Sequence, residues 1–283
     1  MTQIVRKKLD LKKLIKELKS KNKSIGLVPT MGALHQGHIS LIQMSRTQYD
    51  VTVATIFVNP TQFNNPEDLT KYPRNEIEDL DTLTKAGCDI VFIPSDKEMY
   101  EQAPSIKLDF GYLETIMEGK FRPGHFNGVG IIVMKLFGLV EPNGAYFGQK
   151  DLQQFKIIST LVNEFELPIT LHMAPIVRET SGLALSSRNT RLSEEHKKIA
   201  IKLHHALTQA KDSIRQGNSI EKTINNAKQS ISNCTDIELE YFEIVDFKTL
   251  QNISMPNEAD RLALCIAAHV AGVRLIDNII IEG

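Results

Sequence analysis

Short apolar runs alternate with amphipathic stretches along roughly the first 176 residues. The stretch 75–86 carries apolar residues at steps of three from Ile77 to Ala86, which is typical of one face of a helix, and Gly87 follows as a C-terminal cap. The predicted strands are Ile25–Val28, Val51–Val58, Asp89–Ile93, Ala145–Phe147 and Ile169–Ala174, and the helices between them include 39–49 and 75–86. Strands alternating with helices form parallel βαβ units, so the pattern predicts an α/β fold with a Rossmann-like, doubly wound parallel sheet.

The pattern changes near Arg178. A loop rich in Ser, Gly and Arg is followed by Ser193, a predicted helix N-cap. The elements predicted after it are helices 194–216 and 220–232 and strands 237–245, 262–270 and 275–281. Helices followed by strands without alternation indicate a smaller α+β domain. We therefore expect domains at 1–176 and 177–283.

Composition restricts the class of protein and its partners. The chain has 283 residues and 42% hydrophobic content, enough for one large or two medium domains with a core. A formal net charge of −1 gives no bulk electrostatic support for a nucleic-acid partner, and we expect none. Three widely spaced cysteines indicate neither a disulfide framework nor a zinc knuckle, which suits a reducing cytoplasm.

Neither the N-terminal segment nor the longest apolar run of the chain has the pattern of a membrane-spanning helix. Residues 1–21 are predicted to form an amphipathic charged helix without the apolar core of a signal peptide. The longest apolar run, 128–140, is interrupted by Lys135 and is too short to span a bilayer. We expect a cytoplasmic protein with no membrane partner.

The stretch from Ile25 to Ile42, IGLVPTMGALHQGHISLI, is a strand, a Pro/Gly turn and a helix start that contains His35 and His38. Helix N-termini carry unsatisfied N–H groups and partial positive charge, and two imidazoles three residues apart on one face can hold the same anion. A zinc site wants three or four ligands, and no other His or Cys lies close in sequence. The context predicts a site for a nucleoside triphosphate.

Further polar clusters follow other predicted strands. Amides from Asn59 to Asn64, where Val51–Val58 ends, are placed to bind a small polar substrate, although Asn-Pro is also a common turn signal. The segment Gly148–Asp151 offers a lysine for phosphate, and Gln154 lies one turn later on the same face. As an isolated motif this segment would be helix-capping chemistry.

Two more segments have both a functional and a structural interpretation. Leu185–Arg188 supplies two hydroxyls and an arginine that suit phosphate, as part of an interdomain loop that is either a solvated linker or a lid over nucleotide. The Gly-rich segment Arg122–Gly130 is either an anion cradle or a tight connection, and the sequence favours the connection.

Taken together, these motifs resemble a known family. A HIGH-like His35–His38 followed by a KMSKS-like Leu185–Arg188 resembles the nucleotidyl-transferring Rossmann superfamily that includes class I aminoacyl-tRNA synthetases. The longer strings PTMGALHQGH, FVNPTQF, RPGHFNGV, YFGQKDLQQ and LALSSRN are similar to those of the pantothenate synthetases, or pantoate–β-alanine ligases. That resemblance implies ATP-dependent condensation of (R)-pantoate with β-alanine through pantoyl adenylate, giving pantothenate, AMP and pyrophosphate. It also implies Mg²⁺ accompanying ATP and a cytoplasmic homodimer.

The resemblance assigns roles residue by residue. His38 is the expected general acid, with His35, Lys150 and Arg188 as the other catalytic groups. ATP is expected to contact Met31, Gly32, Ala33, Leu34, His35, Gln36, Gly37, His38, Gly148, Gln149, Lys150, Asp151, Val177, Leu185, Ser186, Ser187 and Arg188. Gln62 is expected to bind pantoate and β-alanine, Gln154 to bind pantoate, and Asn59 to bind substrate. No protein ligand to the metal is assigned.

Some points stay open at this stage. Gln149 stands where many members of the family have Glu. Arg188 stands where the class I aminoacyl-tRNA synthetases have a second lysine. The separate roles of His35 and His38, and whether Arg122 and His125 touch ligand, do not follow from the sequence. The rival functions are a plain nucleotidyltransferase that adenylylates a phosphate-bearing substrate, and a nucleotide sensor without turnover.

Overall fold

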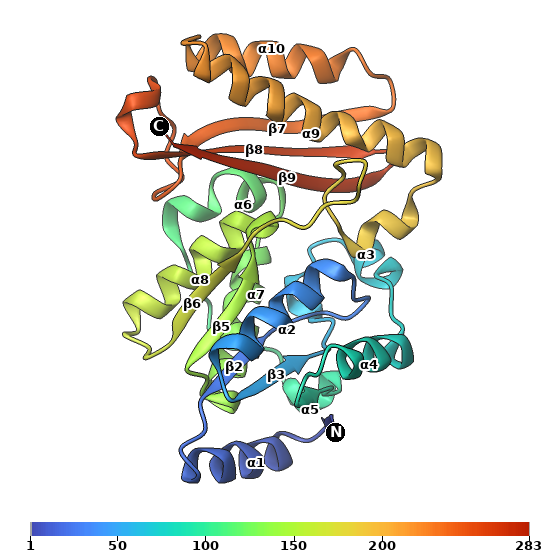
Figure 1. Cartoon of the computed structure of the whole chain (residues 1–283), viewed down its shortest axis with the longest axis vertical. Coiled ribbons are helices and arrows are strands. Elements are labelled where there is room, and N and C mark those ends of the chain that lie inside the picture. The colour runs from blue at the N-terminus through green and yellow to red at the C-terminus, as the bar shows by residue number, and fades with distance from the viewer. Residues whose placement is uncertain (1, 283) are drawn as a thin grey trace. The chain divides into compact units, whose positions relative to one another are not determined.

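The computed structural model describes residues 2–282, which form two compact units (Figure 1). The N-terminal unit comprises Met1–Gln149 and Gln154–Pro175, and the C-terminal unit comprises Lys150–Gln153 and Ile176–Gly283. Met1, the first residue of the predicted first helix, and Gly283, the last residue of the predicted second domain, lie outside the described residues. No helix within residues 2–282 combines the length and the hydropathy that a membrane span requires.

A six-stranded parallel sheet forms the centre of the N-terminal unit, which confirms the predicted Rossmann-like α/β fold. Its strands are β1 (Gln3–Val5), β2 (Ile25–Val28), β3 (Val51–Thr55), β4 (Ile90–Phe92), β5 (Gly144–Gly148) and β6 (Thr170–Ala174). The spatial order is β1-β4-β3-β2-β5-β6, and every neighbouring pair is parallel. The chain winds outward in one direction from β2 and in the other from β5. The carboxyl ends of these two strands therefore border the crevice in which such sheets bind ligands.

Helices cover both faces of this sheet. They are α1 (Lys8–Ser20), α2 (Gln36–Gln48), α3 (Pro66–Lys71), α4 (Glu76–Lys85), α5 (Asp96–Met99), α6 (Met117–Phe121), α7 (His125–Val140) and α8 (Leu152–Glu164), and the first two residues of α8 count with the C-terminal unit. Successive strand residues point to opposite faces, so Leu27 packs in the core with α1, α7 and α8, while Val28 packs with α2 and α4. Both cores are apolar, as expected for a buried parallel sheet.

The first strand corrects a prediction. We expected residues 1–21 to form one helix, but Gln3–Val5 form the edge strand β1 and α1 begins only at Lys8. The backbone N–H of Gln3 donates to the carbonyl of Asp89 at 2.8 Å, and Val5 is buried. A three-residue strand is too short to display an alternation of its own, so the lysine-rich helix pattern after it dominated the sequence signal.

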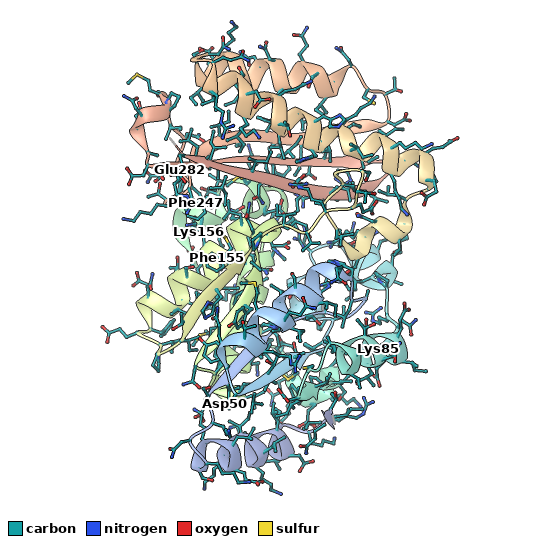
Figure 2. The ribbon with its side chains drawn as sticks, in the orientation of Figure 1. Asp50, Lys85, Phe155, Lys156, Phe247 and Glu282 are labelled. Carbon is teal, nitrogen blue, oxygen red and sulfur yellow. The ribbon has the colours of Figure 1, made fainter. Side chains whose placement is uncertain are left out.

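The starts of β2 and β3 are tied together by Asp50, which Figure 2 labels. Its carboxylate accepts hydrogen bonds from the Ser24 hydroxyl at 2.7 Å and the Ser24 backbone N–H at 2.9 Å, with Lys23 at 3.2 Å. These bonds, the Ser24 hydroxyl first among them, lower the pKa of Asp50 to about 2.

The C-terminal unit is a separate α+β structure, as predicted. Its antiparallel sheet contains β7 (Ile237–Asp246), β8 (Arg261–Val270) and β9 (Val273–Glu282) in that order. Helices α9 (Glu194–Arg215) and α10 (Ile220–Ser232) lie side by side along one face of the sheet (Figure 1). Ser193 caps α9 through a hydrogen bond from the His196 backbone N–H, as its position predicted. Alternate residues of β8, such as Leu264 and Ile266, build the core under the two helices.

Candidate active site

The β2–α2 turn, defined as residues 29–35, follows β2 and is pinned to the neighbouring strand. The Thr30 hydroxyl donates to the Thr55 carbonyl of β3 at 2.6 Å, and the Thr55 hydroxyl accepts from the Thr30 backbone N–H at 3.1 Å. The chain then passes through two left-handed residues, Gly32 with a φ of 83° and Ala33 with a φ of 51°. Such a conformation strains a residue that has a Cβ, so Ala33 needs outside support.

That support comes from Asp79 of α4, which the sequence reasoning missed. Its two carboxylate oxygens accept from the backbone N–H groups of Ala33 at 2.9 Å and Leu34 at 2.7 Å. Asp79 is only 3% exposed, and this burial raises the pKa of its carboxyl against the lowering effect of the two hydrogen bonds. A signal existed: Asp79 lies four residues before the buried Leu83 and so shares its helix face.

The two histidines cap α2. His35 is the N-cap, and its Nδ1 accepts from the Gly37 backbone N–H at 3.1 Å; the Nδ1 of His38 accepts from the His35 backbone N–H at 3.3 Å. The rings lie 4.1 Å apart between centroids and are partly exposed. Because each Nδ1 accepts a hydrogen bond, each neutral ring carries its proton on Nε2. The pair can therefore present two N–H donors at a helix N-terminus, an arrangement that suits an anion.

The amides after β3 form one connected group. The Asn59 side-chain amide donates to Gln62 Oε1 at 3.1 Å and to the Gly128 carbonyl at 3.1 Å, while the Tyr100 hydroxyl donates to Asn59 Oδ1 at 2.8 Å. Gln62 ends the short helix η1 (Pro60–Gln62) and places its Nε2 3.2 Å from Met31 Sδ of the β2–α2 turn. Both amides are almost fully buried. Residues Asn59–Asn64 do form a turn, and this turn also holds the side chain of Gln62 through hydrogen bonds with Asn59 and Met31.

The segment Arg122–Gly130 contains the turn into α7 and the first residues of that helix. Gly124, with a φ of 78°, begins the turn into α7. The His125 ring lies 2.8 Å from the Gln62 carbonyl oxygen and 3.0 Å from the Arg122 guanidinium, and Arg122 pairs with Glu118 at 3.5 Å. His125 therefore contacts the backbone of Gln62, and Arg122 and Glu118 lie behind His125.

The segment after β5 begins in the N-terminal unit and ends in the C-terminal unit. Gly148 is the last residue of β5, the strand that neighbours β2 in the sheet, and Gln149 follows it. The Lys150 ammonium lies 3.2 Å from the carboxylate of Asp151, whose side chain is 43% exposed. The backbone carbonyl of Lys150 accepts a hydrogen bond from the Asn278 side-chain amide of β9 at 3.0 Å. Gln154, on α8, is partly buried within the N-terminal unit.

The 177–189 loop belongs to the C-terminal unit and contains hydrogen bonds between its own residues. The Leu185 N–H donates to the Val177 carbonyl at 3.0 Å, and Ser186 caps the short helix η4 (Ser187–Arg191) by accepting from the Arg188 N–H at 3.3 Å. At its base, Arg178 binds Asp277 of β9 through two hydrogen bonds of 2.6 and 2.8 Å. The sequence reasoning did not single out this buried ion pair, because its members are 99 residues apart.

The predicted site residues thus come from both units. Those of the N-terminal unit are Met31, Gly32, Ala33, Leu34, His35, Gln36, Gly37, His38, Asn59, Gln62, Gly148, Gln149 and Gln154, and those of the C-terminal unit are Lys150, Asp151, Val177, Leu185, Ser186, Ser187 and Arg188. A cavity of about 270 Å³ in the N-terminal unit borders Met31, Pro60 and Asp79. It lies at the carboxyl ends of β3 and β4, next to the fixed amides.

Comparison with known proteins decides the family. The sequence model of the family "Pantoate-beta-alanine ligase" matches residues 3–280. The chain belongs to the pantoate-beta-alanine ligase family. A pantothenate synthetase of Cytophaga hutchinsonii is 49% identical over 94% of both chains, and one from Porphyromonas gingivalis is 46% identical over 95% of both.

Solved pantoate-beta-alanine ligase structures share the fold over nearly the whole chain. The pantothenate synthetase of Thermus thermophilus superimposes with a TM-score of 0.92 at 35% identity, covering 98% of this chain and 99% of the other. The ligase from Francisella tularensis, described as complexed with β-γ ATP and β-alanine, gives a TM-score of 0.82 at 35% identity, with 99% and 97% covered. Family and fold therefore agree with the resemblance found in the motifs.

Proposed function

We propose that this chain condenses (R)-pantoate with β-alanine, driven by the cleavage of ATP to AMP and pyrophosphate. A carboxylate oxygen of pantoate attacks the α-phosphorus, and the bond to the pyrophosphate oxygen breaks, giving pantoyl adenylate. The neutral amine of β-alanine then attacks the acyl carbon, AMP leaves with the bonding electrons, and the surplus amine proton passes to a base. The observation that carries the proposal is the pair of imidazoles capping α2 beyond β2, in a chain that belongs to this ligase family.

His35 and His38 are the proposed partners of the ATP phosphates. Their Nδ1 atoms accept hydrogen bonds from backbone N–H groups, so each neutral ring carries its proton on Nε2, and these Nε2–H groups are the proposed donors to phosphate oxygens. Donors fixed in advance stabilise charge that develops on the leaving pyrophosphate without reorganisation during the reaction. His38 is the proposed general acid for that leaving group.

Charge neutralisation is the second requirement, because ATP and the pantoate carboxylate repel each other. Lys150 and Arg188 are the proposed cations, one as a point charge and one as a planar fork of donors. Mg²⁺ is proposed to enter with ATP, where it would supply further positive charge to the phosphates. The part-exposed carboxylate of Asp151 suits it, since Mg²⁺ prefers phosphate and carboxylate oxygens.

The neutral amides are the proposed pantoate site. Gln62 and Gln154 would bind the carboxylate and hydroxyl oxygens of pantoate, and Gln62 would also lie against the incoming β-alanine. Asn59 is the proposed partner that orients Gln62, supported by the 3.1 Å hydrogen bond between them. Amides bind such oxygens without a tight ion pair that would hold the carboxylate back from attack.

The remaining parts of the proposal concern the C-terminal unit and the cell. We propose that the C-terminal unit closes the 177–189 loop over ATP, with Val177 and Leu185–Arg188 as contacts, because a mixed anhydride must be kept from water. The enzyme is proposed to be a cytoplasmic homodimer that binds no nucleic acid.

An exchange assay tests the function. The ligase predicts pyrophosphate exchange into ATP that depends on pantoate, and release of AMP only after β-alanine is added. Exchange without pantoate would favour a different nucleotidyltransferase, and binding of ATP with no exchange and no AMP would favour a nucleotide sensor. Either result would overturn the proposal.

A further inference from the structure

His125 is the first residue of α7 and makes a directed contact with Gln62. It is 4% exposed, its Nδ1 lies 2.8 Å from the Gln62 carbonyl oxygen and its Nε2 lies 3.0 Å from Arg122 Nη1. A guanidinium can only donate, so Nε2 accepts and the ring proton lies on Nδ1. That N–H therefore donates to the carbonyl of Gln62, and Arg122 determines which nitrogen carries the proton.

The positive charge of Arg122, which contacts His125, is balanced by a carboxylate of the same segment. Arg122 pairs with Glu118 one helical turn earlier, and the two side chains are 16% and 8% exposed. A buried guanidinium without a counter-charge would be strongly unfavourable, so Glu118 keeps Arg122 in place. Glu118, Arg122 and His125 thus form a chain of three groups that ends at Gln62.

The side chain of Gln62 is fixed from a second direction. Asn59 donates to its Oε1, and one Nε2–H of Gln62 donates to Met31 Sδ at 3.2 Å, so the second Nε2–H is the group that can donate to another molecule. A Cβ added to Gly128 of α7 would lie 2.3 Å from the Thr61 carbonyl oxygen and 2.7 Å from Gln62 Cα. Only glycine lets α7 approach η1 this closely, so α7 holds the backbone of Gln62 through both His125 and Gly128.

We propose that His125 is a positioning residue for pantoate binding, and that it acts through Gln62. By holding the Gln62 carbonyl, it directs the Gln62 Nε2–H toward an oxygen of the substrate, so that Gln62 serves as a donor to pantoate. This inference rests on the proposed function, because it assigns the pantoate contact to Gln62. His125 itself touches no substrate.

The test uses three substitutions at one position. His125→Ala removes the donor, His125→Asn places an amide N–H near the Nδ1 position, and His125→Gln places it near Nε2 instead. We expect His125→Ala to raise the KM for pantoate about tenfold, the size of one lost directed hydrogen bond, with the KM for ATP changed less than twofold. His125→Asn should recover most of the loss, and His125→Gln should not.

Two comparisons separate positioning from general destabilisation. In a Gln62→Ala background, His125→Ala should no longer change the pantoate KM, because the two residues act as one unit. His172→Ala is the matched control: this half-buried ring stacks on Tyr146 in the same unit and takes no part in the proposed site. It should lower Tm and leave the ratio of the two KM values unchanged.

The outcomes are distinguishable from a failure of the proposed function. If the unmodified enzyme shows no pantoate-dependent exchange, the proposed function fails. If exchange occurs but His125→Ala changes the two KM values equally, retains the wild-type pantoate KM, or acts equally in the Gln62→Ala background, the positioning role is overturned. Calorimetric binding of pantoate to the wild type and His125→Ala gives the same decision without turnover.

Discussion

The β2–α2 turn and the 177–189 loop both contribute proposed phosphate contacts, yet they are fixed in different ways. The turn is held by its neighbours, Thr55 of β3 and Asp79 of α4, through hydrogen bonds to the backbone. The loop has hydrogen bonds within itself, such as that from the Leu185 N–H to the Val177 carbonyl, and its base is fixed by the ion pair between Arg178 and Asp277. The proposed roles, a fixed wall of the ATP site for the turn and a lid for the loop, would make use of this difference.

The largest effect is expected from His38→Ala, in the first turn of α2 directly after the β2–α2 turn. We expect adenylate formation, measured as pantoate-dependent pyrophosphate exchange, to fall about 10³-fold, as is typical for the loss of a general acid. The fold should lose only about 0.5 to 1 kcal/mol, since the Nδ1 of His38 contributes one capping bond. His205→Ala, at an exposed position of α9, is the control and should change neither value. Full exchange activity in His38→Ala would remove His38 from the mechanism.

The 177–189 loop, the proposed lid, should respond to Asp277→Asn. Asparagine leaves the Arg178 guanidinium without a counter-charge, and we expect the C-terminal unit to lose about 2 to 3 kcal/mol in urea denaturation. If the pair sets the base of the lid, the KM for ATP should rise as well. Glu240→Gln breaks a similar pair with Arg274 in the same sheet and should affect stability alone. An unchanged ATP KM in Asp277→Asn would separate the ion pair from the loop's function.

Asp79→Asn tests whether Asp79 holds the β2–α2 turn in place. The new amide turns an N–H group toward a backbone N–H of the β2–α2 turn, so one donor loses its acceptor, and we expect a loss of about 1 to 2 kcal/mol. The strained Ala33 should then relax and the KM for ATP should rise. Asp81→Asn is matched on the same helix, where Asp81 pairs with the outward-pointing Lys85 of Figure 2, and should do neither. Equal effects of the two substitutions would argue against a role for Asp79 in the turn.

The smallest effect is expected at Asp50, away from both segments. A carboxyl whose pKa is lowered from 3.8 to about 2 in the fold stabilises the fold above pH 3.8, and this contribution is lost as the pH falls through 2. Asp50→Asn should therefore lower Tm slightly at pH 7, and the difference from the wild type should shrink as the pH is lowered to 3. A difference that does not depend on pH would assign the effect to packing.

Much of the fold follows from local sequence signals. The strand Ile25–Val28 and the helix Ile220–Ser232 match their predicted bounds, because a short apolar run between turn residues and a capped amphipathic stretch are unambiguous. The edge strand β1 was predicted as helix, because its pairing with β4 depends on residues about 87 positions away. Local patterns thus identify elements, and long-range pairing decides the exceptions.

The site divides in the same way. Motifs pointed to the segments around His35, Gln62 and Arg188, whose roles stay predictions until they are assayed. The residues that hold them, such as Asp79 and His125, were not predicted as supports, since their partners are 45 and 63 residues away in sequence. A supporting residue has no signature of its own until the fold brings its partner close.

The edge strand β1 has a practical consequence for work with this enzyme. Because β1 runs parallel to β4, its first residue Gln3 lies at the amino end of the sheet, opposite the edge that carries the β2–α2 turn. An affinity tag fused ahead of Gln3 would therefore extend from the side of the sheet that is remote from that turn. Removing β1, in contrast, would uncover the backbone of β4 and create an edge open to aggregation.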